Sequence, residues 1–558
     1  MKKNRTRYIF VMGGVLSGLG KGIAVSSIAK LLQSQGYRVS AMKVDPYVNV
    51  DAGTMNPTEH GEVFVTKDGL ETDQDIGNYE RFLHTELTRE SYMTTGQVYL
   101  SVIRRERNLE YRGKSVQVVP HIPNEVIGRI RHAAEVTRAE IMIIEIGGTV
   151  GEYENLLFLE AARMMRLEHP SDVQFVLVSY LPIPSKLGEM KTKPTQHAVR
   201  ALNSAGIHPD FLLCRAEYPL DAPRRERLSI FCNMKAEDVL SAPDVDSIYE
   251  VPVNFSRERL GEKILAKFDM KARGRDLREW RAMLRKIQRT KRTVKIAMVG
   301  KYFATGEFTL SDSYLSVIES IKHAAWSVGV KPSIEWVNSE EYERHPEKVK
   351  ELARFDGVIV PGGFGSRGVE GKIAAIRFVR MHNIPYFGLC YGMQLAVIEF
   401  ARHVLKLSGA HTTEIDERTP HPVIDMMPEQ RASLEARDFG GTMRLGEYAC
   451  RLTKGSLASA AYGRTTVQER HRHRYEFNND YRDRLNAAGL RVSGLNPDRD
   501  LVEIVELEGH PFFVGVQFHP EFKTYPLDPH PLFRAFIEAA DKRKPTAHGS
   551  RRKSQVRD

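Results

Sequence analysis

The sequence predicts an α/β protein with two domains, each built on a mostly parallel sheet that helices cover. Strand-like apolar runs alternate with helical patterns, which is typical of βαβ units. Runs such as Ile141–Ile146 and Val173–Tyr180 are nearly continuous in apolar residues, as strands covered on both faces are. The length of 558 residues is enough for roughly two to four domains.

The first half opens on a strand, a glycine-rich turn, a helix and a second strand. Residues 8–12 are apolar, 13–22 are rich in glycine, 23–35 have helical spacing, and 39–44 are again strand-like. This order predicts the βαβ unit of a parallel sheet. A later strand is expected at 211–214.

A new sheet is expected after a basic stretch in the middle of the chain. In residues 271–292, Leu277, Trp280, Leu284 and Ile287 recur at helical spacing among arginines, which predicts an amphipathic linker helix on a neighbouring domain. The later elements are expected at 294–299, Gly357–Val360, Tyr386–Leu389, 512–518 and, as a helix, 531–540. The predicted parts are a first domain over 1–270, the linker over 271–292, a second domain over 293–545 and a disordered basic tail over 546–558.

Composition and charge exclude several classes of protein. Residues 271–292 hold ten Lys and Arg against two acids, a net charge of +8, and residues 541–558 hold seven against two, a net charge of +5. Because the whole chain has a net charge of +10, the rest of it carries −3. A broad cationic face for nucleic acid is therefore not expected. No apolar run approaches the about 20 residues of a membrane helix, and the run after the first lysines is short and broken by glycine, unlike a secretion signal. Four cysteines are too few for a disulfide scaffold and fit a cytoplasmic location.

Residues 13–22 (GGVLSGLGKG) are typical of a phosphate-binding turn between a strand and a helix. Backbone N–H groups and the helix N-terminus can hold phosphates there, and Lys21 adds a positive charge. The pattern departs from the standard P-loop, because its first glycine is one residue too distant and Gly22 stands where Ser or Thr would bind magnesium. A tight turn with a surface lysine is the structural alternative.

Two carboxylates are candidates to hold the metal that position 22 cannot hold. Asp75 lies in ETDQDIGNYER, and Glu145 lies near the end of the strand IMIIEI. An acid at the C-terminal end of a parallel strand projects into the crevice where such sheets bind ligands, and Lys43 adds charge to the same crevice. Two carboxylates suit a magnesium ion that bridges phosphates. The alternatives are a helix-capping Asp75 and a structurally paired Glu145.

The segment GEMKTKPTQH predicts a second phosphate-contacting loop. Its lysines, Lys191 and Lys193, are separated by a threonine and followed by a proline, which suits contacts to an anion. Because exposed lysines are common, a solvated surface loop is the alternative.

The second half contains the residues of a thiol nucleophile. The strand-like run 384–389 leads into Gly388-x-Cys390-x-Gly392, a nucleophile elbow in which a strained turn exposes the sulfur and a helix N-terminus favours the thiolate. Downstream, VQFHPE places His519 and Glu521 two residues apart. If that segment is extended, both side chains share a face, so that Glu521 orients His519 and His519 carries the proton of the thiol.

Upstream of the elbow, VIVPGGFGSRG is a strand that runs into a glycine turn. The N–H groups around Gly363 and Phe364 are candidates for an oxyanion hole together with that of Tyr391. Taken singly, Cys390 could be a buried thiol, His519 a core histidine and the glycine run a hairpin turn. Their joint occurrence at the ends of three strand-like runs favours a catalytic site with a thiol nucleophile.

These residues resemble those of the CTP synthase family, and the resemblance extends over nearly the whole chain. The matching strings include MKVDPYVNVDAGTMNPTEHGEVFV, ETDQDIGNYERF, EIGGTVGE, EMKTKPTQH, PGGFGSRGVEG, GLCYGMQ, ERHRHRYEFN and QFHPEF. The resemblance implies a P-loop-like synthase domain similar to dethiobiotin synthetase, followed by a class I glutamine amidotransferase domain. It implies an ATP-dependent carbon–nitrogen ligase, with Mg²⁺ as cofactor and ATP as co-substrate. In the implied reaction, O4 of UTP is phosphorylated and then displaced by ammonia from L-glutamine to give CTP, the last step of de novo pyrimidine nucleotide synthesis.

The same resemblance implies a set of residues for each ligand. The expected catalytic residues are Cys390, His519, Glu521 and Lys21. ATP is expected at Gly18, Leu19, Gly20, Lys21, Gly22, Ile23, Asp75, Pro243, Asp244 and Val245. UTP or CTP is expected at Ser17, Glu152, Tyr153, Glu154, Lys191, Thr192, Lys193, Pro194, Thr195, Gln196 and Arg227. Glutamine is expected at Gly363, Tyr391, Gly392, Met393, Gln394, Glu414 and Arg474, and Mg²⁺ at Asp75 and Glu145.

Regulation and assembly are also implied by the resemblance. GTP is expected as an allosteric activator and CTP as a feedback inhibitor. A homotetramer is expected, with a nucleotide site shared between subunits, and its stacking into filaments is left open. Ammonia needs an internal passage to avoid protonation in bulk water, and His60 and Val63 are candidates to line its exit.

Four residues depart from the family's usual pattern. Arg227 stands where a nucleotide-binding lysine is usual, which keeps the charge and changes the geometry. Pro243 replaces a frequent lysine, and Arg112 occupies a usually apolar position in a loop linked to GTP activation. Tyr391 replaces a common leucine, although its expected role uses only the backbone N–H.

Three other functions compete with UTP amination. A cobyrinate-type amidotransferase also joins these two domain types, but the KTKPTQ string and the glutamate two residues after His519 argue against it. A non-catalytic, filament-forming nucleotide-binding protein is disfavoured by the intact Cys390, His519 and Glu521. Nucleic-acid binding through the basic tail would require salt-sensitive retention that deletion of 541–558 abolishes.

Overall fold

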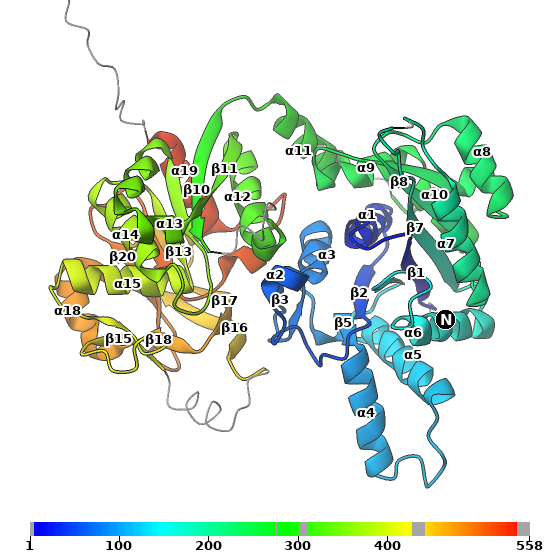
Figure 1. Cartoon of the computed structure of the whole chain (residues 1–558), viewed down its shortest axis with the longest axis horizontal. Helices are drawn as coiled ribbons and strands as arrows, with labels where there is room; N and C mark the ends of the chain where they lie inside the picture. The colour runs from blue at the N-terminus through cyan, green and yellow to red at the C-terminus, as the bar shows by residue number, and fades with distance from the viewer. Residues whose placement is uncertain (1–4, 187, 275, 302–310, 427–440, 544–558) are drawn as a thin grey trace, which may run out of the picture. The chain divides into compact units, whose positions relative to one another are not determined.

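The computed structural model describes residues 5–186, 188–274, 276–301, 311–426 and 441–543 (Figure 1). It confirms the predicted α/β class. The chain forms two compact units: one comprises Met1–Met55 and Thr66–Arg285, and the other comprises Asn56–Val65 and Lys286–Asp558. Asn56–Val65, called the inserted segment below, thus belongs to the second unit although it lies in the first half of the sequence. The expected tail over 546–558 lies outside the described residues.

The first unit is built on a seven-stranded sheet in the order β5-β2-β6-β1-β7-β8-β9. All of its neighbouring strands are parallel, as the βαβ pattern predicts. The strands are β1 (Arg7–Gly14), β2 (Val39–Asp45), β5 (Tyr92–Thr94), β6 (Ile141–Ile146), β7 (Val173–Tyr180), β8 (Phe211–Ala216) and β9 (Val239–Pro243), and β4 (Glu71–Asp73) lies outside this sheet.

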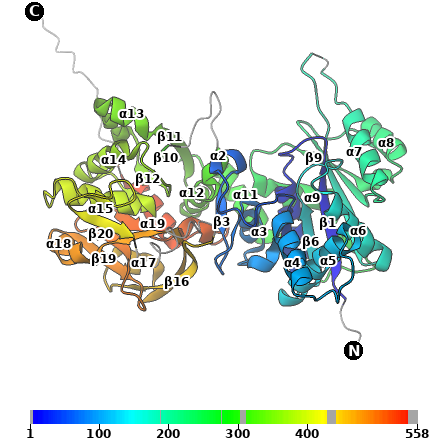
Figure 2. The same cartoon turned by 60° about the horizontal axis from the view of Figure 1, so that its bottom comes forward.

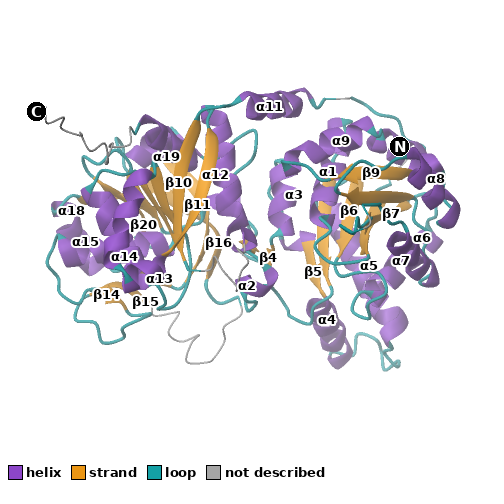
Figure 3. Ribbon diagram, turned by 45° about the horizontal axis from the view of Figure 1, so that its top comes forward, coloured by secondary structure: helices purple, strands orange, loops and turns teal. Residues whose placement is uncertain are grey.

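Helices cover both faces of this sheet (Figure 3). They are α1 (Lys21–Ser34), α3 (Asp75–Leu83), α4 (Thr95–Arg107), α5 (Val118–Val136), α6 (Leu156–Glu168), α7 (Lys193–Ser204), α8 (Ala222–Phe231), α9 (Val251–Arg257) and α10 (Leu260–Lys267), with short 3-10 turns at Arg89–Ser91, Ala236–Asp238 and Ile248–Glu250. Apolar side chains of β1, β6 and β7 pack with those of α5, α6 and α7 in one buried core. Burial of this apolar surface is the main favourable term in the folding of such a layered unit.

The helix expected within 271–292 is α11 (Arg278–Arg289). Trp280, Met283 and Leu284 form its buried face, which confirms the predicted amphipathic pattern. The Trp280 indole N–H donates to the Tyr249 carbonyl at 2.7 Å, and its ring lies 5.4 Å from that of Phe82. An aromatic side chain with a satisfied N–H therefore attaches the start of this helix to the first unit.

The second unit contains a nine-stranded sheet in the order β11-β10-β12-β13-β21-β20-β19-β16-β17. The pairs from β11 to β21 are parallel, and those from β21 to β17 are antiparallel. The sequence predicted the parallel part and not the antiparallel extension, because strands joined by short connections leave no crossover pattern. The strands are β10 (Thr293–Gly300), β11 (Lys331–Asn338), β12 (Gly357–Val360), β13 (Tyr386–Leu389), β16 (Arg444–Leu452), β17 (Thr466–His473), β19 (Leu490–Leu495), β20 (Val502–Leu507) and β21 (Phe513–Val516).

Two buried apolar clusters flank the nine-stranded sheet. The helices of this unit are α2 (Pro57–His60), α12 (Leu315–Val328), α13 (Ser339–Arg344), α14 (Val369–Met381), α15 (Tyr391–His403), α17 (Leu457–Tyr462), α18 (Arg482–Ala487) and α19 (Pro531–Lys542), with 3-10 turns at Ser311–Tyr314, Pro346–Arg354, Asn479–Tyr481 and Pro520–Lys523. The shorter strands are β3 (Val63–Val65), β14 (His411–Thr412), β15 (Pro422–Met426) and β18 (Tyr475–Phe477). Figure 2 shows α2 and β3 of the inserted segment beside α12. Among the helices of the described ranges, none is long and apolar enough to cross a membrane.

Candidate nucleotide and glutaminase sites

The glycine-rich turn of the first unit leads directly into α1. Gly18 and Gly20 have φ of 71° and 77°, a left-handed conformation that glycine adopts without steric cost. The helix begins at Lys21 rather than at the predicted position 23, and β1 extends to Gly14 because both of its last glycines pair with β7. Lys21 Nζ donates to the Gly148 carbonyl at 2.9 Å, and burial lowers its pKa. The turn therefore presents a helix N-terminus and a lysine, as an anion site requires.

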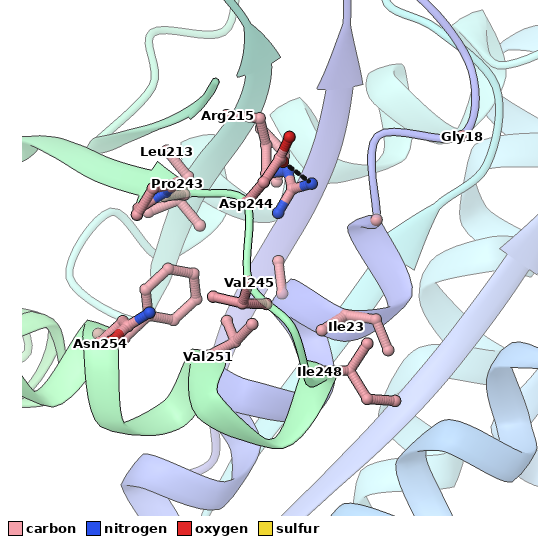
Figure 4. Close-up of a pocket in the computed structure, with 15 residues that line it drawn as sticks. Gly18, Ile23, Leu213, Arg215, Pro243, Asp244, Val245, Ile248, Val251 and Asn254 are labelled. Atoms are coloured by element: carbon pink, nitrogen blue, oxygen red, sulfur yellow. Dashed lines mark hydrogen bonds and ion pairs between the residues drawn. The ribbon is translucent and has the colours of Figure 1, made fainter. Parts of the chain in front are cut away.

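A cavity of about 500 Å³ adjoins this turn (Figure 4). It brings together residues that the sequence assigned to ATP: Gly18, Gly20, Ile23, Pro243, Asp244 and Val245. Arg215 of β8 forms an ion pair with Asp244 at 2.7 Å, and apolar side chains such as Val251 line the cavity beside Val245. The cavity is also lined by residues that were not expected from the sequence: Arg215 comes from β8, Ile248 from the 3-10 turn before α9, and Val251, Asn254 and Phe255 from one face of α9. A partly apolar cavity beside a phosphate-type turn has the composition that a purine nucleotide needs.

The candidate metal ligands meet at the Lys43 side chain. Lys43 on β2 lies beside Glu145 on β6 in the sheet register, and its Nζ is 3.1 Å from a Glu145 oxygen. Lys43 also forms an ion pair with Asp75, and the Tyr79 hydroxyl donates to Glu145. Burial and the Asp75 charge raise the pKa of Glu145. Burial also acts to raise the pKa of Asp75, but the charge and hydrogen bond of Lys43, together with the hydrogen bonds of Asp73 and Asn78, lower it. The two carboxylates thus converge on one point.

The Asp75 carboxylate lies over Gly22, so that a Cβ at position 22 would overlap its Oδ1. The carboxylate therefore takes the space that a Ser or Thr side chain would need, which agrees with the sequence argument. Among the described residues, no group of three or more His, Cys, Asp or Glu is arranged to hold a metal. Magnesium commonly takes one or two protein carboxylates and completes its shell with water and phosphate oxygens, so Asp75 and Glu145 fit such an ion.

The residues expected to contact UTP or CTP lie on three loops and on the helices α7 and α8 of the first unit. Thr192, Thr195 and Gln196 are buried at the start of α7, and the Thr195 and Ser179 hydroxyls are 2.8 Å apart. Tyr153 is 89% exposed. None of the residues expected to contact UTP or CTP lines the cavity of Figure 4. These residues are Ser17, Glu152, Tyr153, Glu154, Lys191, Thr192, Lys193, Pro194, Thr195, Gln196 and Arg227.

Cys390 of the second unit is on a strained elbow between β13 and α15. Its φ of 48° and ψ of −98° lie in a region that costs on the order of 1–3 kcal/mol for a residue with a side chain. Glycine is needed on one side, because a Cβ on Gly392 would overlap the Val360 carbonyl oxygen. The Cys390 N–H donates to Val516 of β21 at 2.7 Å. These contacts hold the predicted elbow at the C-terminal ends of adjacent parallel strands.

His519 and Glu521 form a buried pair beside this elbow. His519 Nδ1 and Glu521 Oε1 are 2.7 Å apart. The segment does not have the extended form that would put both side chains on one face of a strand. Instead, Pro520 opens a 3-10 turn over Pro520–Lys523 that brings the two side chains together. A Cβ on Gly362 would lie 3.0 Å from His519 Cε1 and 3.8 Å from Cys390 Cβ, so both residues flank the glycine turn after β12. Burial opposes the imidazolium, but the charges of Glu521 and Cys390 favour it and raise the pKa of His519 to about 10.

Three of the expected glutamine-binding residues form hydrogen bonds with segments around the elbow. Glu414 Oε1 accepts from the Gly365 N–H at 3.0 Å, and Gln394 donates to the Tyr475 carbonyl at 2.9 Å. The Tyr391 hydroxyl donates to the Gly365 carbonyl at 3.2 Å. The Tyr391 side chain therefore connects the elbow to the opposite glycine turn. Arg474 donates to the Thr442 hydroxyl at 2.8 Å.

Lys372 and Gln517 also lie close to the elbow, although neither was expected there from the sequence. Lys372 is fully buried on α14, with Nζ 5.2 Å from the centre of the Tyr391 ring, and burial together with the Lys301 charge lowers its pKa to about 7. Gln517 Nε2 is 3.7 Å from Cys390 Sγ. Gln517 stands two residues before His519, so its place in VQFHPE was the only available signal.

An elbow cysteine with a His–Glu pair in one unit, and a phosphate-type turn with two carboxylates in the other, define a class: ATP-dependent glutamine amidotransferases. Family comparison agrees, because the CTP synthase N-terminus matches residues 7–270 and the class I glutamine amidotransferase matches residues 309–539. The chain belongs to the CTP synthase family.

Full-length relatives support this membership. The CTP synthase of Caldanaerobacter subterraneus subsp. tengcongensis is 50% identical over 535 residues, which are 96% of this chain and 98% of the relative. That of Chloroflexus aurantiacus is 52% identical over 537 residues, 96% of each chain. That of Symbiobacterium thermophilum is 51% identical over 539 residues, 96% of this chain and 98% of the relative.

Proposed function

We propose that the chain catalyses the ATP- and glutamine-dependent amination of UTP to CTP. One observation carries the proposal: a chain of this family has an elbow cysteine with a His–Glu pair in one unit and a phosphate-type turn in the other. The carbonyl oxygen at C4 of uracil is a poor leaving group, and phosphorylation makes it a good one. An enzyme that aminates UTP therefore needs both an ATP site and a source of ammonia.

In the proposed synthase reaction, O4 of UTP attacks the γ-phosphorus of ATP, N3 of the uracil loses its proton, and ADP leaves. Ammonia then adds to C4 and loses a proton, and phosphate departs with the electrons of the C4–O4 bond to give CTP. Lys21, at the N-terminus of α1, would offset the charge on the transferred phosphoryl group. Asp75 and Glu145 would hold Mg²⁺, which when bound neutralises phosphate charge.

In the proposed glutaminase reaction, the sulfur of Cys390 attacks the carboxamide carbon of glutamine and forms a thioester. His519 gives its proton to the departing ammonia and then draws one from the water that hydrolyses the thioester. Glu521 keeps His519 oriented. The N–H groups of Gly363 and Tyr391 would stabilise the oxyanion, and Glu414 and Arg474 complement the ammonium and carboxylate groups of glutamine.

The remaining parts of the proposal rest on the family resemblance. They are UTP or CTP binding by the residues named above, activation by GTP, feedback inhibition by CTP, a homotetramer with a shared nucleotide site, a cytoplasmic location, and domain limits at 1–270, 271–292, 293–545 and 546–558. An ammonia passage with His60 and Val63 at its exit belongs to the same group. Arg227, Pro243 and Arg112 bear on the strength of nucleotide binding and activation.

Replacing the nucleophile tests whether ammonia production and UTP amination are separate steps. Cys390→Ala is expected to abolish CTP formation from glutamine and to retain CTP formation from added ammonium chloride, because ammonia then bypasses the thiol. The shift of ultraviolet absorbance from uracil to cytosine measures both rates. Asp75→Ala is the converse control, which should lose ATP-dependent turnover and keep glutamine hydrolysis. Loss of the ammonia-supported rate in a folded Cys390→Ala protein would contradict two separate sites.

A further inference from the structure

The inserted segment is held at the N-terminus of α12. The Glu62 carboxylate accepts hydrogen bonds from the Ser316 N–H, at 3.1 Å, and from the Ser316 hydroxyl. The Glu62 N–H donates to the Asp312 carbonyl at 2.9 Å, and Ser313 Oγ donates to the Pro57 carbonyl at 3.1 Å. A carboxylate at a helix N-terminus is favoured by the orphan N–H groups and the helix dipole. The segment is therefore fixed in the second unit by specific polar contacts.

An aromatic series runs from this segment to His519. The Phe64 ring meets the Phe522 ring edge-on, at 4.9 Å between centroids and an interplanar angle of 60°. The Phe522 ring stacks on the His519 imidazole, at 5.1 Å and 12°. Phe64 is 1% exposed, so its ring cannot move away without leaving a cavity or shifting its neighbours.

Arg470 of β17 joins the same two groups by another route. Its Nη1 donates to the Val65 carbonyl at 3.1 Å, and its guanidinium lies 5.6 Å from the centre of the Phe64 ring. Its own carbonyl accepts from the His519 N–H at 2.7 Å. Arg470 therefore holds the end of the inserted segment with its side chain and the backbone of His519 with its main chain.

The hydrogen bond to Glu521 fixes only one edge of the imidazole ring. Rotation about the Nδ1···Oε1 direction would still redirect Nε2, the nitrogen that must face the sulfur for proton transfer, and the stacked Phe522 ring opposes that rotation. A small misplacement of a catalytic group costs far more rate than binding affinity. We propose that Phe64 is a positioning residue for glutamine hydrolysis, which acts on His519 through Phe522. This inference rests on the proposed role of His519.

The test uses the full chain and measures ammonia release from glutamine without UTP. Phe64→Leu keeps an apolar side chain and removes the ring edge, so kcat is expected to fall by about tenfold with KM for glutamine nearly unchanged. Alkylation of Cys390 by iodoacetamide, read by mass spectrometry of its peptide, should slow as well, because a misplaced His519 stabilises the thiolate less. A structural role alone would lower folded protein and leave both rates per folded molecule unchanged.

A double-mutant cycle tests the route through Phe522. If Phe64 acts through that ring, Phe64→Leu adds no further loss of kcat to Phe522→Leu; fully multiplicative losses would overturn the proposal. Phe536→Leu is the matched control, since Phe536 is equally buried in the same unit and its ring contacts Phe387 and Phe512. Equal kinetics for Phe64→Leu and this control would also overturn it. The His519→Ala variant separates the positioning role of Phe64 from the proposed catalytic role of His519. If His519→Ala did not reduce glutamine hydrolysis, the proposed role of His519 itself would be refuted.

Discussion

Gly22 and Cys390 occupy positions where one atom more or less decides whether a site can form. Gly22 leaves room for the Asp75 carboxylate beside the N-terminus of α1. Cys390 keeps a strained backbone because the Val516 carbonyl and the glycines around it leave the elbow no relaxed alternative. Such strain persists only where the surrounding structure over-determines it. At this scale, the available space around the backbone matters as much as the identity of the reactive side chain.

Adding a single methyl group at position 22 is expected to disable the synthase site. In Gly22→Ala the new Cβ would overlap the Asp75 carboxylate, which must move away from Glu145. A displacement of this kind costs about 100-fold in rate, so ammonia-supported CTP formation should fall by about that factor while glutamine hydrolysis persists. Gly128→Ala is the matched control in the same unit, because no atom lies within 4 Å of its added Cβ. An unchanged ammonia-supported rate in Gly22→Ala would contradict the role of Asp75.

Helix α11 and the turn over Pro520–Lys523 show how single elements depend on a few anchors. The helix carries many charges, and its attachment comes from one apolar face on which Trp280 packs against the stacked rings of Tyr249 and Phe82. The 3-10 turn forms at Pro520, whose ring presets the backbone for such a turn, and it brings Glu521 to His519. In both elements, the local geometry depends on a side-chain contact, that of Trp280 with two rings and that of Glu521 with His519, which the order of residues in the sequence does not reveal.

Loss of the Trp280 anchor is expected to destabilise the first unit without altering chemistry at the elbow. Trp280→Ala removes a 2% exposed ring and its hydrogen bond to Tyr249, which should lower the free energy of unfolding by about 3–5 kcal/mol. Urea unfolding followed by fluorescence and circular dichroism measures this change. The exposed Arg285 of the same helix offers a control, since Arg285→Ala should cost less than about 0.5 kcal/mol. A similar small cost for Trp280→Ala would show that the helix is attached elsewhere.

Across the whole molecule, each unit has its own buried core, and the second also buries a network of charges. Arg444 lies 3.1 Å from Glu476 and 2.6 Å from Glu503, beside His471 and His473, whose ring nitrogens are 2.9 Å apart. Burial raises the pKa of Glu476 to about 8 and that of Glu503 to about 7, despite the nearby guanidinium. Burial lowers the pKa of both histidines. The stability of this unit is therefore linked to pH.

The sign of this linkage follows from the raised pKa of Glu476. Between its ordinary value of 4.5 and about 8, the folded state keeps a proton that the unfolded state releases, so the contribution is complete below pH 4.5 and is lost as pH rises through 8. Glu476→Gln removes this titration, so the Tm of the variant relative to that of the wild type should rise progressively between pH 5 and 8. A difference of 1 kcal/mol corresponds to about 2–4 °C in a unit of this size. Glu538→Gln serves as control, since the Glu538 side chain is 40% exposed and pairs with Arg534 at the surface of α19. Parallel Tm profiles for wild type and Glu476→Gln would contradict the linkage.

Sequence patterns alone determined the α/β class, the parallel strands and the local motifs around Lys21 and Cys390, because these depend on residues close together in the chain. Tertiary structure decided what the motifs meet. It brought Arg215, Asn254 and Phe255 to one cavity and placed the Asp75 carboxylate over Gly22. It also turned Glu521 toward His519 and brought the Tyr391 hydroxyl to the Gly365 carbonyl. It also placed Phe64 next to the ring that stacks on His519. The physical reason is that periodicity reports which face of an element is buried, whereas the partner of a buried side chain is set by packing in three dimensions, whether that partner is two residues away, as Glu521 is from His519, or hundreds of residues away, as Phe522 is from Phe64.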